Sequence, residues 1–313
     1  MNIIYKTDLK KEDYLEMLKL WNDEMGKIYP INPGSFDYNV INYKDKRGMK
    51  AVDETGKLVG FVILKEFHDD YLTSYEDCLF VHLFYVSKKY RRNGIGSKLV
   101  DYIKEEGKRG DKTIWIGKEI GNFAPGIPCE FDNLTDVFLE KRGFSCGRYT
   151  HDLINREPKK MEISNSNVNY EICTKEKKDK LVEFIERNGW KRWAYEAIQE
   201  FKNDENNKCY IIGILDGKVI SFAKVNTLTD GRNSYNMMWK DRFDNLGGIG
   251  PLGVDKDYRK MHLGGDIIKA AQNYLVDYGV SDIIIDWTGL MELYQKYGFE
   301  VYKTYKYTNL KKE

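Results

Sequence analysis

The sequence is poor in residues that bind metals or form disulfides. Its 313 residues include only five cysteines and four histidines. The cysteines are scattered without a CxxC pair, and the histidines show no spacing typical of a metal site or a catalytic triad. We therefore expect reduced thiols, no disulfide framework and no bound metal.

An excess of charge and a long apolar run are also missing. Fifty Lys and Arg residues balance 49 Asp and Glu residues, for a formal net charge of +1, which argues against a nucleic-acid surface. No apolar run approaches the roughly 18 residues of a membrane-spanning helix. Lys6, Asp8 and Lys10 stand where a signal peptide would be apolar. We expect a cytoplasmic protein with no nucleic-acid or membrane partner.

One segment occurs twice. Residues 86–100 are echoed by residues 254–268, a displacement of 254 − 86 = 168 residues. In both copies an apolar, β-rich run leads into a basic turn and then into an amphipathic helical pattern. The chain is long enough for two domains, and a polar stretch separates the copies. We expect domains at 1–154 and 170–313, joined by a linker at 155–169.

The turn between strand and helix predicts an anion site. The first backbone N–H groups of a helix have no partner within the helix and face the positive end of its dipole, which suits a pyrophosphate. Gly94 and Gly96 allow the backbone to approach phosphates, while Arg91 and Arg92 add positive charge. An ordinary turn with two solvated arginines is the alternative interpretation.

Arg91-x-x-Gly94-x-Gly96, after a hydrophobic strand, resembles the acetyl-CoA-binding signature of the GCN5-related N-acetyltransferase (GNAT) family. Each half also ends in this family's manner, at Gly143-Phe144 and Gly298-Phe299. The resemblance implies α/β architecture in two tandem GNAT-like domains, each with a mixed, mostly antiparallel sheet flanked by helices, and acetyl-CoA as cofactor. The cofactor-binding residues that it implies are Val86, Arg91, Arg92, Asn93, Gly94, Ile95, Gly96 and Ser97 in the first half, and Val254, Arg259, His262, Leu263, Gly264 and Gly265 in the second.

The glycine-rich segment 247–253 precedes the second loop. In the resembled family the corresponding strand is splayed from its neighbour, so that its backbone groups can take the pantetheine. Glycines would suit that arrangement. The alternative interpretation is an ordinary β-bulge.

Direct acetyl transfer to an amine calls for a carboxylate and a phenol. Asp286 ends an apolar strand, where desolvation would raise its pKa and its charge would hold a substrate ammonium. Capping of the next helix is its alternative role. Tyr294, four residues before Gly298, occupies the position where the resembled family often carries the tyrosine that protonates the CoA thiolate. Tyr297 is the reserve candidate, and core packing is the alternative role for both tyrosines.

The first half lacks this pair. Aligning residues 114–117 with 283–286 puts Gly117 opposite Asp286, and Leu139 takes the place of Tyr294, leaving only Glu119 nearby. The second half in turn has His262 where the first has Gly94, and a side chain there crowds the pyrophosphate. We expect the C-terminal half to catalyse, and the N-terminal half to bind acetyl-CoA unproductively or to shape the substrate cleft.

Residues 250–254 and 285–288 resemble acetyltransferase modules found with bacterial N-acetylhexosaminidases, and stand-alone glucosamine or glucosaminide N-acetyltransferases. This implies transfer to the 2-amino group of an amino sugar, with Asp286 and Trp287 contacting the substrate. Trp287, Trp239 and Tyr235 would offer aromatic platforms for a sugar. The alternatives are another small amine or a peptide N-terminus and, from a different class, a non-catalytic acyl-CoA-binding sensor.

Overall fold

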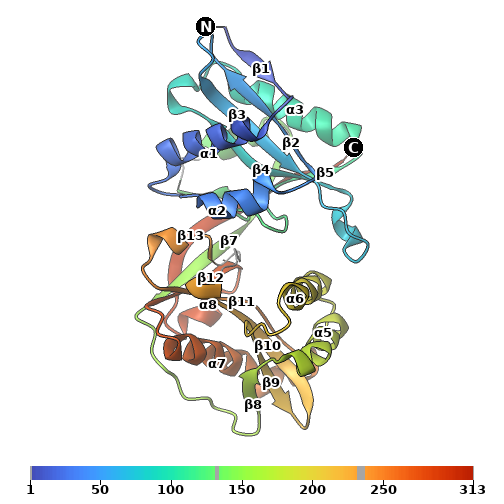
Figure 1. Ribbon diagram of the computed structural model, residues 1–313, viewed down its shortest axis with the longest axis vertical. Helices are drawn as coiled ribbons and strands as arrows, with labels where there is room; N and C mark the ends of the chain where they lie inside the picture. Colours follow the sequence, from blue (N-terminus) through green and yellow to red (C-terminus); the bar gives the residue numbers. More distant parts are fainter. Residues whose placement is uncertain (1, 131–133, 231–236, 313) are drawn as a thin grey trace. The chain divides into compact units, whose positions relative to one another are not determined.

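The computed structural model describes residues 2–130, 134–230 and 237–312 (Figure 1). The chain divides into two compact units, which we call unit 1 (Met1–Thr150 with Lys303–Glu313) and unit 2 (His151–Tyr302). Each unit has a mixed sheet with flanking helices. The expected fold class, with two tandem domains of this architecture, is confirmed.

Unit 1 orders its strands β1-β2-β3-β4-β5-β13, and all neighbours pair antiparallel except the parallel pair β4 and β5. The strands are β1 (Ile4–Lys6), β2 (Lys46–Val52), β3 (Leu58–Lys65), β4 (Cys78–Val86), β5 (Thr113–Ile116), β6 (Ile127–Pro128) and, from Lys303 onward, β13 (Glu300–Leu310). The helices are α1 (Lys11–Met25), α2 (Pro33–Phe36), the π-helical η1 (Asp37–Ile41), the 3₁₀ turns η2 (Thr73–Tyr75) and η3 (Lys88–Tyr90), α3 (Ile95–Arg109) and α4 (Leu134–Glu140).

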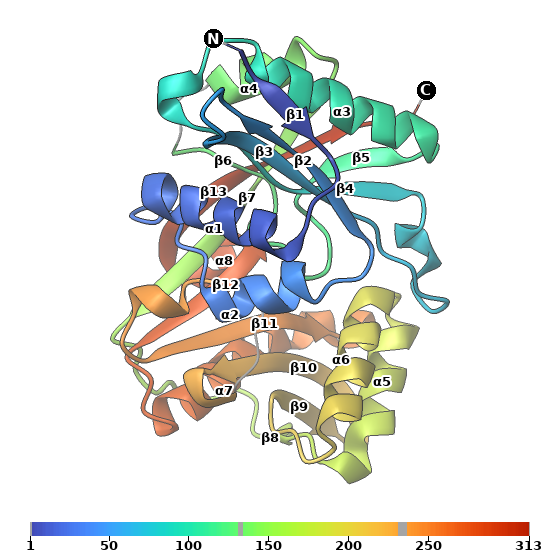
Figure 2. The ribbon, with the colours of Figure 1, turned by 45° about the horizontal axis from the view of Figure 1, so that its top comes forward.

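The core of unit 1 lies on both faces of its sheet. All eight residues of β3 are buried, because α1 and α3 pack against this strand from opposite faces (Figure 2). On α3, Ile95, Leu99 and Ile103 recur at helical spacing and are buried against the strands. An amphipathic helix stabilises itself chiefly through such a buried face.

Unit 2 orders its strands β7-β12-β11-β10-β9-β8, with only β11 and β12 parallel. The strands are β7 (Ser145–Arg156, from His151 onward in this unit), β8 (Asn169–Ile172), β9 (Tyr210–Leu215), β10 (Lys218–Thr227), β11 (Leu246–Val254) and β12 (Asp282–Thr288). The helices are the 3₁₀ turns η4 (Lys175–Lys177), η5 (Leu228–Asp230), η7 (Lys240–Arg242) and η8 (Lys256–Met261), with α5 (Lys178–Arg187), α6 (Lys191–Asn203), α7 (Leu263–Asp277) and α8 (Met291–Gln295). Every residue of β10 after Lys218 is buried, with α7 on one face and α5 on the other (Figure 1).

The compact units do not follow the linear division at 154 and 170. The end of β7 pairs with β12 in unit 2, and the end of β13 pairs with β5 and β6 in unit 1. The expected linker also has partners. Its segment 161–165 lies along α7, where Asp266 accepts from the backbone N–H groups of Ser164 and Asn165 at 2.9 Å. The boundaries of the two compact units are set by sheet pairing between distant segments, which cannot be recognised from the order of motifs along the sequence.

Both units contain a parallel strand pair that diverges. In unit 1, β4 and β5 pair from Cys78↔Thr113 only as far as Val81↔Ile116. In unit 2, β11 and β12 pair from Leu246↔Asp282 only as far as Gly248↔Ile284. These registers match the alignment that put Gly117 opposite Asp286. The strand that precedes each loop therefore continues without its parallel neighbour, as expected for a splayed strand.

The glycine-rich strand β11 is also bulged. Ala223 opposes Leu252 while Val225 opposes Ile249, so β10 places one residue opposite two residues of β11. The two are Gly250, with a φ of 137°, and Pro251, joined by a cis peptide bond. The sequence suggested either a splayed strand or a β-bulge for this segment, and β11 has both features.

Removing residues 303–313 should destabilise unit 1. Tyr305 and Thr308 of β13 are 1% and 0% exposed, and their loss would open an edge on β5. We expect faster hydrogen–deuterium exchange at residues 114–116 and a lower unfolding temperature, while β9 and β10 keep their protection. A truncation after Leu310 is the control. Exchange that changes only in unit 2 would contradict the assignment of β13 to unit 1.

Candidate active site

Asp286 lies in a β-bulge of β12. Where β12 pairs with β7, Asp286 and Trp287 together oppose the single residue Asp152. Trp287 has a φ of 51°, a left-handed conformation that is strained for a bulky residue, and its backbone N–H donates to Asp152 Oδ1 at 3.2 Å. Bulges re-aim side chains, often beside active sites. This one puts two carboxylates next to each other.

The surroundings of Asp286 favour its protonated form. Burial, followed by the neighbouring Asp152, raises the pKa of Asp286 from 3.8 to about 7, while Arg192 acts in the opposite direction. The side chain is nevertheless only partly buried by exposed area. Asp286 therefore combines a pKa near neutrality with contact to solvent, as a general base requires.

Helix α6 provides a wall beside the two carboxylates. The Arg192 guanidinium lies 4.4 Å from the ring centroid of Trp287, and its Nε donates to Glu196 Oε1 at 2.9 Å. Trp239 donates from Nε1 to Asp152 Oδ2 at 2.9 Å. The two expected tryptophans therefore lie in this region, which holds the carboxylates of Asp152, Glu196 and Asp286. Tyr235, the third expected platform, lies outside the described residues.

Tyr294 is buried beside Asp286. Its side chain is 5% exposed, and burial, together with the Asp286 carboxylate, raises the pKa of the phenol to about 12, while Thr288 lowers it through a hydrogen bond. The phenol therefore stays protonated at neutral pH and can act as a proton donor. The structure places Asp286 and Tyr294, which are separated in sequence, in one electrostatic environment.

Tyr297 has a different position. A methyl group added at Gly265 would lie 2.0 Å from the Tyr297 hydroxyl oxygen, so this phenol covers the first turn of α7. Arg142 does the same in unit 1, donating from Nη2 to Ser97 Oγ at 2.5 Å. Tyr297 and Arg142 each precede the terminal Gly-Phe of their half. This shared position favours a packing role for Tyr297 and leaves Tyr294 as the better acid candidate.

The two expected cofactor loops have the same backbone form. Gly94 and His262 are the N-cap residues of α3 and α7, with φ of 79° and 59°. In α3 the amide of Lys98 donates to Gly94 O at 3.1 Å, so the amides of Ile95, Gly96 and Ser97 precede the helical ladder. Apart from the adjacent backbone, no atom of the described residues lies within 4 Å of a methyl group added at Gly94. The loop thus offers open space in front of unpaired helix amides.

The other expected cofactor-binding residues differ in their hydrogen bonds and in their exposure to solvent. Arg91 donates from Nε to Val86 O at 3.0 Å, and Asn93 to Tyr90 O at 3.2 Å, so both help to hold the loop. Ile95, Leu263 and Gly265 are buried. The others are at least partly exposed: Val86, Arg91, Arg92, Asn93, Gly94, Gly96, Ser97, Val254, His262 and Gly264. The side chain of Arg259 lies outside what the structure describes.

Sequence reasoning missed Asp152, Arg192 and Glu196. Asp152 comes from the segment assigned to the first domain, and only the pairing of β7 with β12 brings it to Asp286. The buried positions Ala194, Ala197 and Phe201 of α6 form a stripe that predicts a helix. Nothing in that pattern distinguishes its charged residues from a solvated face.

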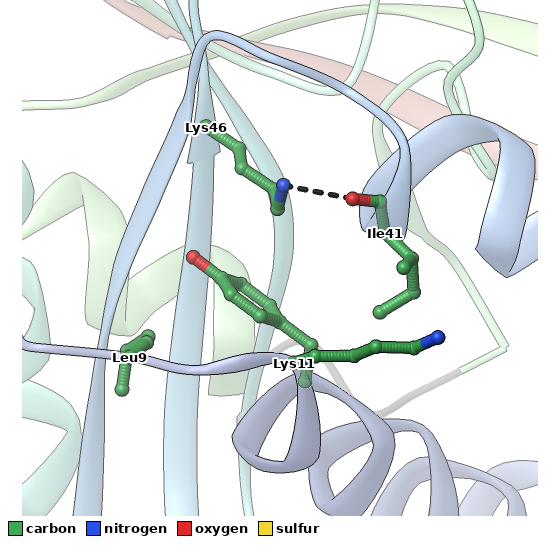
Figure 3. A pocket seen from close by; sticks show the side chains of 5 residues that line it. Leu9, Lys11, Ile41 and Lys46 are labelled. Carbon is green, nitrogen blue, oxygen red and sulfur yellow. Dashed lines mark hydrogen bonds between the residues drawn. The ribbon is translucent and has the colours of Figure 1, made fainter.

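A separate shallow cavity of about 200 Å³ lies in unit 1 between the start of α1 and β2 (Figure 3). Leu9, Lys11, Tyr14, Ile41 and Lys46 line it. The Lys46 ammonium donates to the carbonyls of Ile41 and Tyr43 at 3.0 and 2.7 Å, so this charge is used in holding the local backbone. None of the expected site residues lies there.

Metal-binding and membrane-spanning features were searched for in residues 2–130, 134–230 and 237–312. There, no group of three His, Cys, Asp or Glu side chains could hold a metal ion. No helix in these ranges has the length and apolarity needed to cross a membrane. The five cysteines, all of them within the described ranges, form no disulfide.

Comparison with known proteins gives one family and a set of similar folds. The sequence matches the family described as Acetyltransferase (GNAT) family over residues 14–124 and 171–299. No curated protein matches it significantly. A structure described as a GCN5-related glucosamine N-acetyltransferase region of a fungal multi-domain GH3 β-N-acetylglucosaminidase superposes with a TM-score of 0.87 at 21% identity, over 99% of this chain. This chain spans 38% of the length of that fungal protein.

Two further structures match along the whole chain. A GCN5-related N-acetyltransferase from Sphaerobacter thermophilus has a TM-score of 0.70 at 13% identity, covering 98% of this chain and 95% of its own. A tandem GNAT protein from the clavulanic acid biosynthesis pathway has a TM-score of 0.68 at 14% identity, covering 100% and 99%. At these identities the likeness shows the fold, here with two halves in tandem.

Asp286→Asn should stabilise the protein at alkaline pH. The folded-state pKa of about 7 lies above the ordinary 3.8, so the folded protein binds this proton more tightly than the unfolded chain does. That contribution is fully present below about pH 4 and is lost as the pH rises through 7. We expect calorimetry to show a higher unfolding temperature than wild type at pH 8 and little gain at pH 4. Equal gains at both pH values would contradict the raised pKa.

Proposed function

Because the chain belongs to the GNAT acetyltransferase family, we propose that it moves an acetyl group from acetyl-CoA directly to a primary amine, the 2-amino group of glucosamine or a glucosaminide. The observation that carries this proposal is the pairing of Asp286, with a pKa of about 7, and Tyr294, with a pKa of about 12. A base poised near neutrality beside a protonated phenol suits proton removal from an amine and proton delivery to a leaving group.

The acceptor side supports an amino sugar. The carboxylates of Asp152, Glu196 and Asp286 favour an ammonium and accept from hydroxyl groups. The Trp239 indole donates to Asp152, and the partly exposed Trp287, whose ring lies beside the Arg192 guanidinium, provides an apolar face of the kind that packs on sugar rings. The fungal structure with the same fold is described as a glucosamine N-acetyltransferase, which supports the same acceptor class here.

The residues of both loops fit the phosphates of acetyl-CoA. Open space stands before the helix amides at Gly94, and likewise at Gly264, and α3 and α7 present their N-termini there. His262 adopts the left-handed backbone of Gly94, and its exposed side chain narrows the approach to the second loop while offering a donor. The bulged strand β11 diverges from β12, leaving backbone groups for the pantetheine.

Each residue has a defined part in the transfer. When bound, acetyl-CoA supplies an acyl thioester whose thiol departs. Asp286 holds the acceptor as its cation and then takes the amine proton, with Asp152 keeping the affinity of Asp286 for that proton high. Tyr294 donates a proton toward the departing sulfur from a phenol that burial keeps protonated. Trp287 holds the bulge that presents Asp286.

We assign catalysis to the C-terminal half and cofactor binding without turnover to the N-terminal half. Gly117 takes the place of Asp286 in the register of β5, and Leu139, 1% exposed, takes that of Tyr294. We also propose that the sequence repeat consists of the segments 1–154 and 170–313, joined by the connection 155–169. The repeated motifs follow one another along the chain in this order, although the last strand of each segment pairs with the other unit.

A screen of acceptors tests the proposed function. We expect CoA release from acetyl-CoA with glucosamine and its oligomers, and much less with polyamines, aminoglycosides or amino acids. If another amine is acetylated and glucosamine is not, the proposal of a sugar acceptor is wrong, while the acetyltransferase activity stands. Binding of acetyl-CoA with no turnover of any amine would favour the sensor.

Variants separate the proposed roles. Asp286→Asn should lower kcat about 10²-fold or more, the usual loss for a general base. Tyr294→Phe should lower kcat with little change in acetyl-CoA affinity, because its proton matters only as charge develops on sulfur. Tyr297→Phe is the matched control, with kcat near wild type. If only Tyr297→Phe loses activity, the general acid is Tyr297, one helical turn after Tyr294.

A further inference from the structure

Four charged side chains of unit 2 meet at the bulge of β12. Besides Asp286 they are Asp152 on β7 and Arg192 and Glu196 on α6, each of which shifts the pKa of Asp286. Asp152 and Glu196 are buried, at 4% and 9% exposed, while Asp286 and Arg192 are partly exposed. We call these four residues the Asp286 cluster. It combines three carboxyl groups with one guanidinium.

Arg192 is held in place from two sides. Its Nε donates to Glu196 Oε1 at 2.9 Å, one turn further along α6, and its guanidinium lies 4.4 Å from the ring centroid of Trp287. The two side chains of the ion pair are only 18% and 10% exposed. A charge-assisted hydrogen bond is stronger when it is partly removed from water. The positive charge of Arg192 is therefore fixed beside Asp286.

The charges of the Asp286 cluster compensate one another unequally. Arg192 neutralises Glu196 through a direct ion pair. Asp152 accepts a backbone N–H and an indole N–H, neutral donors that stabilise its charge without cancelling it. Asp286, with a pKa of about 7, is protonated in part of the molecules at neutral pH. The cluster thus carries one uncompensated negative charge when Asp286 is protonated and two when it is ionised.

This balance suits a single ammonium group. An ammonium at Asp286 satisfies the uncompensated charge. A second ammonium a few atoms away would meet the Arg192 guanidinium, and like charges repel strongly where water is partly excluded. The hydroxyl groups next to the amine of glucosamine carry no charge and avoid this repulsion. The amines of a glucosamine oligomer are separated by a whole sugar unit, so the restriction concerns two ammonium groups close together.

We propose that Arg192 determines acceptor specificity: by occupying Glu196, its guanidinium admits an amine with one ammonium group and excludes short diamines. This inference rests on the proposed function for the place of the acceptor at Asp286. A repulsive element against the wrong ligand is an effective source of specificity. Removing Arg192 takes away the repulsion and leaves the Glu196 carboxylate available to a second ammonium.

Amine binding to the full chain tests this role of Arg192. Saturation-transfer NMR titrations at pH 7 compare propylamine with 1,3-diaminopropane, which has a second ammonium on a chain of the same length. We expect Arg192→Met to bind the diamine about tenfold more tightly than wild type, with a gain of at most about threefold for propylamine. Arg192→Gln is a second neutral variant and should show the same change. A merely structural role would weaken both amines alike.

Two matched variants isolate the charge. Arg192→Lys keeps the positive charge and should discriminate against the diamine as wild type does. The double variant Arg192→Met with Glu196→Gln removes both charges of the ion pair, so the diamine should bind no better than it binds wild type. A gain that persists in the double variant overturns the proposal, because Glu196 is then not the partner of the second ammonium.

The remaining outcomes separate this inference from the proposed function. Diamine binding that is equal in wild type, Arg192→Met and Arg192→Gln overturns the role of Arg192, and so does the absence of amine binding in all of them. Acetyl transfer to glucosamine is measured on the same wild-type sample. If the diamine binds as expected but no transfer occurs, the proposed function is wrong, while the charge selectivity of the Asp286 cluster stands.

Discussion

The register of β7 against β12 is the constraint on which the candidate active site depends. One residue of β7 faces two residues of β12, and the extra residue can be accommodated only by a bulge. The bulge forces Trp287 into a left-handed conformation, and Asp152 holds it there by accepting its backbone N–H. The same carboxylate that fixes the backbone also raises the pKa of Asp286. Asp152 therefore contributes both to the backbone geometry of the site and, after burial, to the proton affinity of Asp286.

The two units share the same backbone arrangement and differ in the side chains that lie where the parallel strands diverge. Their parallel strands start in the same register and diverge within one residue pair of the same place, and both loops begin a helix from a left-handed residue. Past the divergence, unit 2 has the partly exposed Asp286, whereas unit 1 has a buried hydrogen bond between His82 and Glu119. A repeated backbone thus carries an acidic candidate site in unit 2 and a buried hydrogen-bonded pair in unit 1.

Burial has opposite consequences at the two centres. In unit 2 it raises the pKa of Asp286 into the range of a useful base, at the expense of stability above neutral pH. In unit 1 it lowers the pKa values of Lys65 and His82, which keeps His82 neutral and fixes its donor and acceptor roles. Desolvation favours the uncharged form in every case, and the residue type decides what that form can do.

The sequence by itself determined the repeat, the family, the left-handed turn before each helix and the candidates Asp286 and Tyr294. These follow from short patterns, in which strand, glycine and helix succeed one another within a few residues. Only the tertiary structure decided the rest. Asp152 is brought to Asp286 by pairing between distant strands, and β13 returns to the first unit by the same means. Which of two phenols lies beside Asp286 depends on the direction in which a short helix packs. Local periodicity carries no record of such long-range registers, because a strand's sequence specifies its buried face but not the partner that covers its edge.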